Sequence, residues 1–130
     1  DDIFAVLERI SPLIAEHGTF NFCLSNGQAL FSYAVTKLHW IVREYPFKQA
    51  RLIDLDVEVD FSHVTTPEDR VAVITTEPLT DNEVWQAYQP GEMILFQHGR
   101  AIKYAQTVID RLTRKAKDPR LKRITKADQY

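Results

Sequence analysis

The sequence predicts an α+β domain in which antiparallel sheets carry flanking helices. Three observations predict it. Two segments repeat apolar residues at helical spacing, about six segments have the composition of strands, and turn residues join most of those strands as hairpins. The length of 130 residues and the apolar content of 45% fit one domain with a sizeable core and argue against disorder.

The first predicted element is an amphipathic helix over residues 2–16, docked on a sheet. Gly18 follows it and suits the left-handed position just after a helix. Pro12 lies inside the pattern, so a kink or an early break near Ser11 is an alternative. The apolar residues with helical spacing are Ile3, Phe4, Val6, Leu7, Ile10, Leu13 and Ile14.

Two strands joined by a tight turn come next. Residues 19–24 and 29–35 have strand composition, and the Asn-Gly pair at 26–27 between them is a strong hairpin signal. Residues 37–47 are rich in apolar and aromatic side chains and include a proline. We expect them to form an ordered loop that packs against the domain.

Residues 51–61 alternate between apolar and mostly acidic side chains, which predicts a strand or ribbon with one face in water. Residues 65–69 are expected to turn. Residues 71–76 are β-branched and apolar without alternation, which predicts a central strand buried on both faces. Thr80 and Glu83 then fit a Thr-x-x-Glu capping box, which predicts a short helical turn.

A second hairpin and a second helix complete the predicted elements. The Pro-Gly pair at 90–91 indicates a turn, and residues 93–96 and 101–105 are the strands of the hairpin. Apolar residues regain helical spacing from Gln106, and Pro119 is expected to end that helix.

The net charge of −2 hides a division of the chain. Residues 1–110 hold 16 acidic and 8 basic side chains, whereas residues 111–130 hold 2 acidic and 8 basic ones. We therefore divide the chain into a main domain (1–110) and a basic terminal helix and tail (111–130). A basic tail can bind nucleic acid or an anionic membrane, but a solvated tail lying against an acidic body is the simpler interpretation.

Several other classes are disfavoured. There is no run of about 18 apolar residues and the start does not resemble a signal peptide, so we expect no membrane span and a cytoplasmic protein. The single cysteine excludes an internal disulfide and a cysteine-rich zinc site. We expect Cys23 to be a small buried core residue on one face of a strand, since nothing nearby in the sequence would lower its pKa.

No metal or cofactor is expected. Alternate residues of a strand lie about 6.5–7 Å apart, so a row of carboxylates along one face cannot converge on one ion. That row is Asp54, Asp56, Glu58 and Asp60. The histidines show no metal-ligand spacing and are interpreted as packed or turn residues: His17, His39, His63 and His98.

One polar cluster suggests a site. Thr75, Thr76 and Glu77 follow the predicted buried strand, and functional residues often lie at strand ends. The alternative is that the threonines satisfy local backbone groups while Glu77 caps a turn or pairs with an arginine. The residues alone do not decide between these two interpretations.

Four runs of the chain, taken together, resemble the second half of stand-alone bacterial class II glutamine amidotransferase-like proteins. The resemblance covers roughly residues 3–105, and its runs are residues 20–31, 36–40, 56–62 and 71–85. It implies the fold of the N-terminal-nucleophile hydrolases, an αββα sandwich of two packed antiparallel sheets. It also implies hydrolysis of the side-chain amide of glutamine to glutamate and ammonia.

In that family a cysteine at the mature amino terminus attacks the amide, its α-amine acts as base, an Asn-Gly pair forms the oxyanion hole, and an Arg and an Asp hold the substrate. Here residue 1 is Asp, and the Asn-Gly pair at 26–27 is a hairpin turn. No catalytic residue of the family maps onto this chain. The resemblance therefore places the catalytic cysteine outside the chain and gives Thr75, Thr76 and Glu77 at most a supporting role behind the substrate-binding residues.

Two hypotheses follow. The chain is either the C-terminal half of a glutaminase, inactive alone, or a non-catalytic interaction module built on half a sandwich. The expected partners are glutamine, as substrate of the complete protein, and a missing N-terminal half or another copy of the chain. Half a sandwich exposes an apolar face, so these residues alone are expected to aggregate or dimerise. A monodisperse, cooperatively melting monomer would contradict this.

Overall fold

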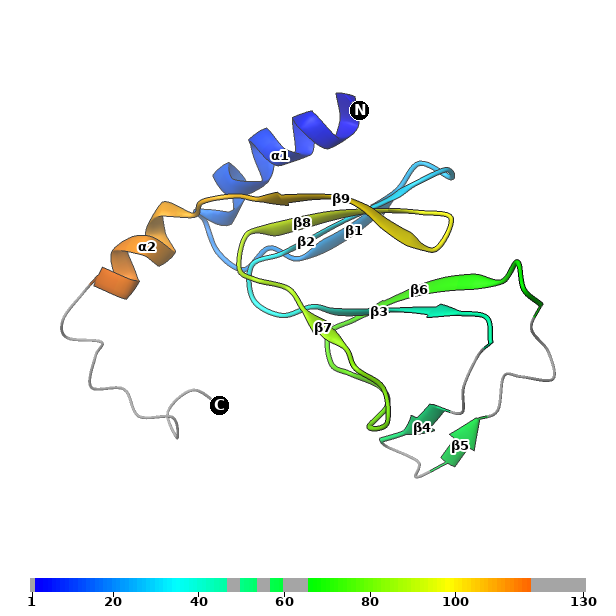
Figure 1. Cartoon of the computed structure of the whole chain (residues 1–130). Coiled ribbons are helices and arrows are strands. Elements are labelled where there is room, and N and C mark those ends of the chain that lie inside the picture. Colours follow the sequence, from blue (N-terminus) through cyan, green and yellow to red (C-terminus); the bar gives the residue numbers. More distant parts are fainter. Residues whose placement is uncertain (1, 47–49, 54–56, 60–65, 118–130) are drawn as a thin grey trace.

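The computed structural model describes residues 2–46, 50–53, 57–59 and 66–117, and in this part of the chain it confirms an α+β fold with antiparallel sheets (Figure 1). Strands β1 (Phe22–Ser25), β2 (Leu30–Ala34), β8 (Glu92–Gln97) and β9 (Arg100–Gln106) form a four-stranded sheet in the order β1-β2-β8-β9. Strands β6 (Arg70–Thr75), β3 (His39–Glu44) and β7 (Gln86–Ala87) form a three-stranded sheet in the order β6-β3-β7. Strands β4 (Ala50–Leu52) and β5 (Val57–Val59) form a separate pair.

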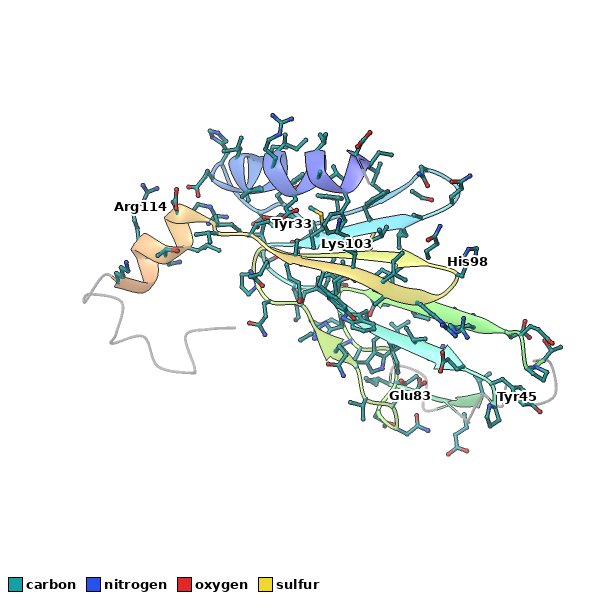
Figure 2. The ribbon with its side chains drawn as sticks, turned by 45° about the horizontal axis from the view of Figure 1, so that its top comes forward. Tyr33, Tyr45, Glu83, His98, Lys103 and Arg114 are labelled. Atoms are coloured by element: carbon teal, nitrogen blue, oxygen red, sulfur yellow. The ribbon has the colours of Figure 1, made fainter. Side chains whose placement is uncertain are left out.

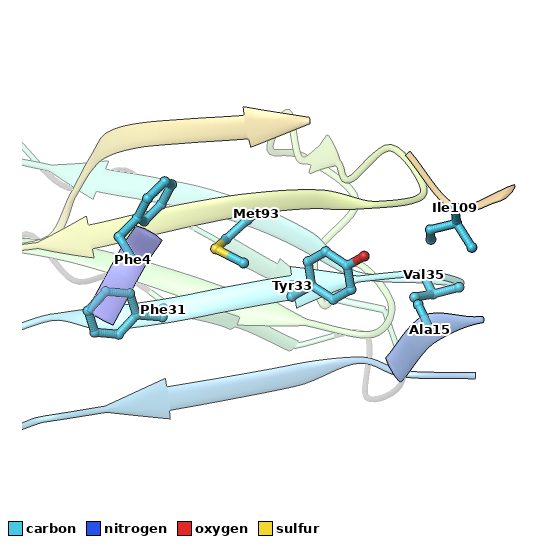
Figure 3. Close-up of a cluster of buried hydrophobic side chains, with 7 residues drawn as sticks. All are labelled: Phe4, Ala15, Phe31, Tyr33, Val35, Met93 and Ile109. Atoms are coloured by element: carbon cyan, nitrogen blue, oxygen red, sulfur yellow. The ribbon is translucent and has the colours of Figure 1, made fainter. Parts of the chain in front are cut away.

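Helix α1 (Asp2–Ala15) lies across one face of the four-stranded sheet, and the three-stranded sheet lies against the other face (Figure 1). The layer between α1 and the sheet is a continuous apolar cluster, which Figure 3 shows. Its buried members are Phe4, Ala15, Phe31, Tyr33, Val35, Met93 and Ile109. Burying a large apolar side chain contributes about 1.5–3 kcal/mol, so this cluster is the main force that fixes α1 on the sheet.

A second cluster fills the space between the two sheets. Its buried residues are Ala34, Leu38, Tyr88, Ile94 and Phe96. Trp40 of β3 meets Phe96 of β8 edge to face, with ring centroids 5.5 Å apart. Such aromatic pairs favour one geometry, so this contact helps to set how the two sheets stack.

Helix α2 (Asp110–Lys117) is joined to the C-terminal end of α1 by Arg111. The Arg111 guanidinium donates to the backbone oxygens of Ala15, at 2.7 Å, and Gly18, at 2.8 Å. The Ala15 carbonyl is at the end of α1 and the Gly18 carbonyl is in the turn that follows, so Arg111 ties α2 to both the helix end and its exit turn. Among the helices that the structure describes, none is long and apolar enough to cross a membrane.

The first helix and both hairpins confirm the sequence predictions. Pro12 lies inside α1 without ending it. Gly27 adopts φ +87° in the β1–β2 turn, and His98 and Gly99 adopt positive φ in the β8–β9 turn. These conformations are the ones for which glycine and Asn-type turn sequences are selected, which explains why local signals located both hairpins.

Two strand predictions were wrong, and a third had left two alternatives open. Residues 39–44 of the predicted loop form β3, whose two faces are both covered, so no alternation shows in the sequence. The segment 51–61, predicted as a strand or ribbon, contains two short strands paired as a ribbon, and residues 54–56 and 60–61 lie outside the described residues. Strand β6 is antiparallel and lies at one edge of its described sheet, where Val71 is 46% exposed.

Two helix predictions also need correction. No helical turn starts at Thr80; residues 80–85 form an irregular segment that ends in β7. The second helix begins at Asp110 instead of Gln106, because β9 continues through Gln106 and pairs that residue with Glu92. Pro119 lies outside the described residues.

Candidate functional site

The polar cluster at the end of β6 lies beside the start of β3. Thr75 is the last residue of β6, and its hydroxyl donates to the backbone oxygen of Glu77 at 2.6 Å. The Nδ1 atom of His39 lies 2.9 Å from the backbone oxygen of Thr76. The Lys37 ammonium forms an ion pair with the Glu77 carboxylate. The fold therefore brings these three residues together with the chain that enters β3.

Exposure limits how strongly this cluster is held. The side chains of Lys37 and Glu77 are 55% and 61% exposed, and an ion pair in water contributes about 0–1 kcal/mol. Thr76 is exposed as well, whereas Thr75 is half-buried. The cluster thus offers an accessible carboxylate next to a backbone turn fixed by Thr75 and His39.

A second polar network lies further along the segment that joins β6 to β7, around Glu83. Glu83 receives two hydrogen bonds from the Arg43 guanidinium, at 2.7 and 2.9 Å, and one from the Thr80 hydroxyl at 2.7 Å. Trp85 Nε1 donates to the same Thr80 hydroxyl at 2.9 Å. Arg43 lowers the pKa of Glu83 below its usual value. Glu83 is labelled in Figure 2, on the side of the molecule away from α1.

The Thr-x-x-Glu motif therefore marked a real side-chain contact but not a helix. Thr80 is 2% exposed and its hydroxyl donates to the Glu83 carboxylate, whereas a capping box would join each side chain to the backbone N–H of the other residue. The chain does not continue as a helix because Glu83 is bound to Arg43 on β3 and Trp85 leads directly into β7. The Arg43 and Trp85 partners carried no local signal in the sequence.

A third polar contact is buried between the sheets. The hydroxyls of Ser32 and Tyr88 lie 2.5 Å apart, and the Ser32 hydroxyl is also 3.0 Å from the backbone oxygen of Ile94. Burial raises the pKa of Tyr88 well above its ordinary value, so its phenol stays protonated. Ser32 and Tyr88 are 56 positions apart in the sequence, which explains why sequence analysis did not find this pair.

Cys23 is exposed, which corrects the expectation of a buried core residue. It lies on β1, at the edge of the four-stranded sheet among the described strands, so fewer neighbours cover it than cover Ser32, its partner on β2. Desolvation raises the pKa of its thiol. A nucleophilic cysteine needs the opposite shift, so Cys23 lacks the character of a catalytic thiolate.

Two cavities open near the inter-sheet space. One has a volume of about 340 Å³ and lies at the hairpin tips, where Arg70, Gln97 and His98 meet an apolar floor that includes Phe96. His98 is labelled at this tip in Figure 2. The other, about 550 Å³, has Trp40 and Tyr104 in its wall. Thr75, Thr76 and Glu77 line neither of these two cavities.

Within the described ranges, no group of three or more His, Cys, Asp or Glu side chains is placed to hold a metal ion. Three of the four acidic residues considered as a row, Asp54, Asp56 and Asp60, lie outside those ranges, as does His63. Of the other histidines, His17 and His98 are exposed and His39 is half-buried at the Thr76 backbone.

The chain is similar to known proteins over most of its length. Residues 1–120 match the family model described as "Glutamine amidotransferases class-II". The chain is 46% identical over 100 residues to "Putative glutamine amidotransferase YafJ" of Escherichia coli K12, covering 77% of this chain and 39% of that protein. It is 41% identical over 101 residues to "Putative glutamine amidotransferase" of Haemophilus influenzae, covering 78% of this chain and 34% of that protein.

A solved structure shows the same relationship. The crystal structure of a "predicted glutamine amidotransferase" from Pseudomonas aeruginosa aligns with a TM-score of 0.59 at 42% identity. The alignment covers 76% of this chain and 41% of that one. The chain thus spans about two fifths or less of the length of the curated relatives it matches.

Proposed function

The chain belongs to the class II glutamine amidotransferase family, and from that premise we propose that it is part of an enzyme that hydrolyses the side-chain amide of glutamine to glutamate and ammonia. The family match over residues 1–120 carries the proposal. The stacking of two antiparallel sheets beneath α1 supports it, since an N-terminal-nucleophile hydrolase is built on two such sheets.

We place the nucleophile of the proposed reaction outside this chain. Acyl transfer from an amide requires an activated nucleophile and donors aimed at the developing oxyanion. Cys23, the single cysteine of the chain, has a raised pKa, which opposes activation. In the proposed enzyme a cysteine with a free α-amine performs the attack. The chain described here supplies the sheets behind it and is inactive alone.

Within this chain, Thr75, Thr76 and Glu77 are the proposed supporting residues. Their turn is fixed by the Thr75 hydroxyl and by His39, and it presents an accessible carboxylate at one end of the β3–β6 pair. Such a group can orient substrate-binding residues without touching the reacting atoms. The proposed enzyme is cytoplasmic and needs no cofactor, and we assign residues 111–130 to its basic terminal helix and tail.

The first test is of the reaction. The complete reading frame that contains this chain is expressed, and ammonia and glutamate release from glutamine is measured for the complete protein and for a variant with its amino-terminal cysteine changed to Ala. Release that depends on this cysteine is expected. A complete protein that never releases ammonia from glutamine would reject the proposed reaction and favour the interaction module.

The second test asks which end of the β3–β6 pair supports the proposed reaction, by comparing one variant at each end. Glu77 and Glu44 are exposed carboxylates, each in one ion pair, at opposite ends of the β3–β6 pairing. Glu77→Gln is expected to lower kcat/KM for glutamine several-fold, whereas Glu44→Gln leaves it unchanged. Equal effects of the two substitutions would remove the supporting role from the Thr75–Glu77 turn.

A further inference from the structure

Glu92 places a carboxylate on the inner face of the four-stranded sheet. Alternate residues of a strand face the same side, and Ile94 and Phe96 of β8 are buried in the cluster between the two sheets. Glu92 lies two residues before Ile94, so its side chain faces the same space, and the residue is half-buried. Removing a carboxylate from water is unfavourable unless a cation or hydrogen-bond donors compensate for the lost hydration.

The protein itself supplies little of that compensation. One carboxylate oxygen of Glu92 accepts a hydrogen bond from the backbone N–H of Gln89 at 3.2 Å, and the carboxylate has no other partner in the described part of the chain. No Lys, Arg or His side chain of the described residues lies within ion-pair distance of it. A carboxylate has about four acceptor positions, so Glu92 has capacity for further donors.

The same carboxylate lies in the wall of a cavity that also contains two aromatic side chains. The cavity has a volume of about 550 Å³, and its wall includes Trp40 of β3, Glu92 of β8 and Tyr104 of β9. The rings of Trp40 and Tyr104 have centroids 6.4 Å apart. Tyr104 pairs with Ile94, which makes it a diagonal neighbour of Glu92 on one face of the sheet. Among the described residues that line this cavity, Glu92 is the charged one.

A carboxylate beside two aromatic rings has the chemistry that recognises an organic cation. The rings attract a cation that lies within about 6 Å of their centroids, and the carboxylate accepts charge-assisted hydrogen bonds from an ammonium group. A neutral apolar ligand would leave the Glu92 carboxylate without a partner, and an anion would be repelled by it. The volume lies within the range of small-molecule sites, about 300–1,000 Å³.

We propose that the cavity formed by Trp40, Glu92 and Tyr104 binds a small alkylamine in its protonated, ammonium form. The ammonium group lies at the Glu92 carboxylate, and the alkyl part lies against the two rings. Thr75, Thr76 and Glu77 do not line this cavity, so the inference stands whether or not the chain serves glutamine hydrolysis.

A comparison of butylammonium with 1-butanol tests whether the charge is required. The complete protein that contains this chain is labelled with ¹⁵N, and NMR follows the Trp40 indole and the amides of Glu92 and Tyr104 at constant ionic strength. Alkylamines are protonated at pH 7, as lysine is. We expect saturable shifts with a Kd of about 1–10 mM for butylammonium and binding at least ~10-fold weaker for 1-butanol. Equal binding of the two probes, or no shift at ~100 mM butylammonium, would overturn the proposal.

Two glutamate variants test the carboxylate. Glu92→Gln removes the charge and is expected to weaken butylammonium binding at least ~10-fold, since hydrogen bonds to charged groups are the stronger ones. Glu8→Gln is the matched control, because Glu8 is exposed on α1 and does not line the cavity. It should leave the Kd within about twofold, as expected for a distant exposed charge. Equal Kd values for the two variants would reject the site.

Two tyrosine variants test the aromatic wall. Tyr104 is 55% exposed, so the fold is expected to tolerate its substitution, and thermal melts check this. Tyr104→Phe keeps the ring and should keep the affinity for butylammonium, whereas Tyr104→Leu should weaken it by about 3–10-fold. A folded Tyr104→Leu protein that binds butylammonium as well as the Tyr104→Phe protein would reject recognition of the cation by the ring.

Discussion

Replacement of Gly99 by alanine is expected to lower the free energy of unfolding more than the backbone strain of the turn alone would, because the added methyl group contacts the other sheet. Gly99 lies in the β8–β9 turn with φ +72°, against the first residue of β6. A Cβ atom there would lie 2.7 Å from the backbone oxygen of Arg70 and 2.8 Å from its carbonyl carbon. Both atoms are backbone, so β6 and the hairpin must move apart.

Gly27 provides the matched control. It lies in the β1–β2 turn with φ +87°, and a Cβ atom there would have no heavy atom within 4 Å. Left-handed backbone costs an alanine about 1–2 kcal/mol, and the lower entropy of the unfolded chain returns about 0.4–1 kcal/mol. Gly27→Ala should therefore cost about 1 kcal/mol. Overpacking adds about 1–3 kcal/mol, so Gly99→Ala should cost about 2–4 kcal/mol.

Urea unfolding followed by tryptophan fluorescence measures both free energies. Trp40 lies between the sheets, so its emission reports their separation. The decisive quantity is the difference between the two variants, since the turn strain largely cancels. Equal destabilisation by Gly99→Ala and Gly27→Ala would refute the close approach of the β8–β9 turn to Arg70.

Three further changes in unfolding free energy are expected. Because the pKa of Glu83 is lowered, its pairing with Arg43 stabilises the fold above about pH 4.5, and this stabilisation is lost as the pH falls through the folded pKa. The Glu83→Gln variant should therefore be less stable than the unchanged protein at pH 7 and should lose less stability on acidification. Urea midpoints of both proteins at pH 7 and pH 3 measure this difference. Ser32→Ala should cost about 1–3 kcal/mol, because it leaves the buried Tyr88 hydroxyl without its partner. Tyr88→Phe should cost about 1 kcal/mol, because the Ser32 hydroxyl keeps the Ile94 carbonyl as acceptor. The reverse order of these two costs in urea unfolding would contradict the hydrogen-bond assignment. Arg111→Met should cost about 1–2 kcal/mol through the loss of two bonds to the end of α1, and thermal melts that match the unchanged protein would argue against this docking of α2.

The elements that the sequence predicted well are those whose cause is local. Helix α1 follows from a repeat within 14 residues, and both hairpins follow from turn residues that favour positive φ. Strand β3 was missed because its residues meet the four-stranded sheet on one face and the segment of Glu83 on the other. A strand covered on both faces by distant segments carries no alternation.

The candidate site shows the same limit. Thr75, Thr76 and Glu77 were identified from a run of polar residues after an apolar strand, which is a local signal. Their partners Lys37 and His39 lie 37 to 40 residues earlier, and only the antiparallel pairing of β3 with β6 brings them together. The position of β6 at an edge was likewise unpredictable, since neighbours in a sheet are set by long-range pairing.

The contacts between the sheets connect the fold to the proposed reaction. Catalysis by positioned groups loses rate when those groups shift by about 1 Å. The Thr75–Glu77 turn belongs to the three-stranded sheet, and the placement of that sheet depends on Trp40 against Phe96 and on Tyr88 against Ser32. Changes at these contacts should therefore reduce kcat in the proposed complete enzyme by shifting the three-stranded sheet. The effect on kcat should exceed the effect on KM, since orientation is altered more than binding.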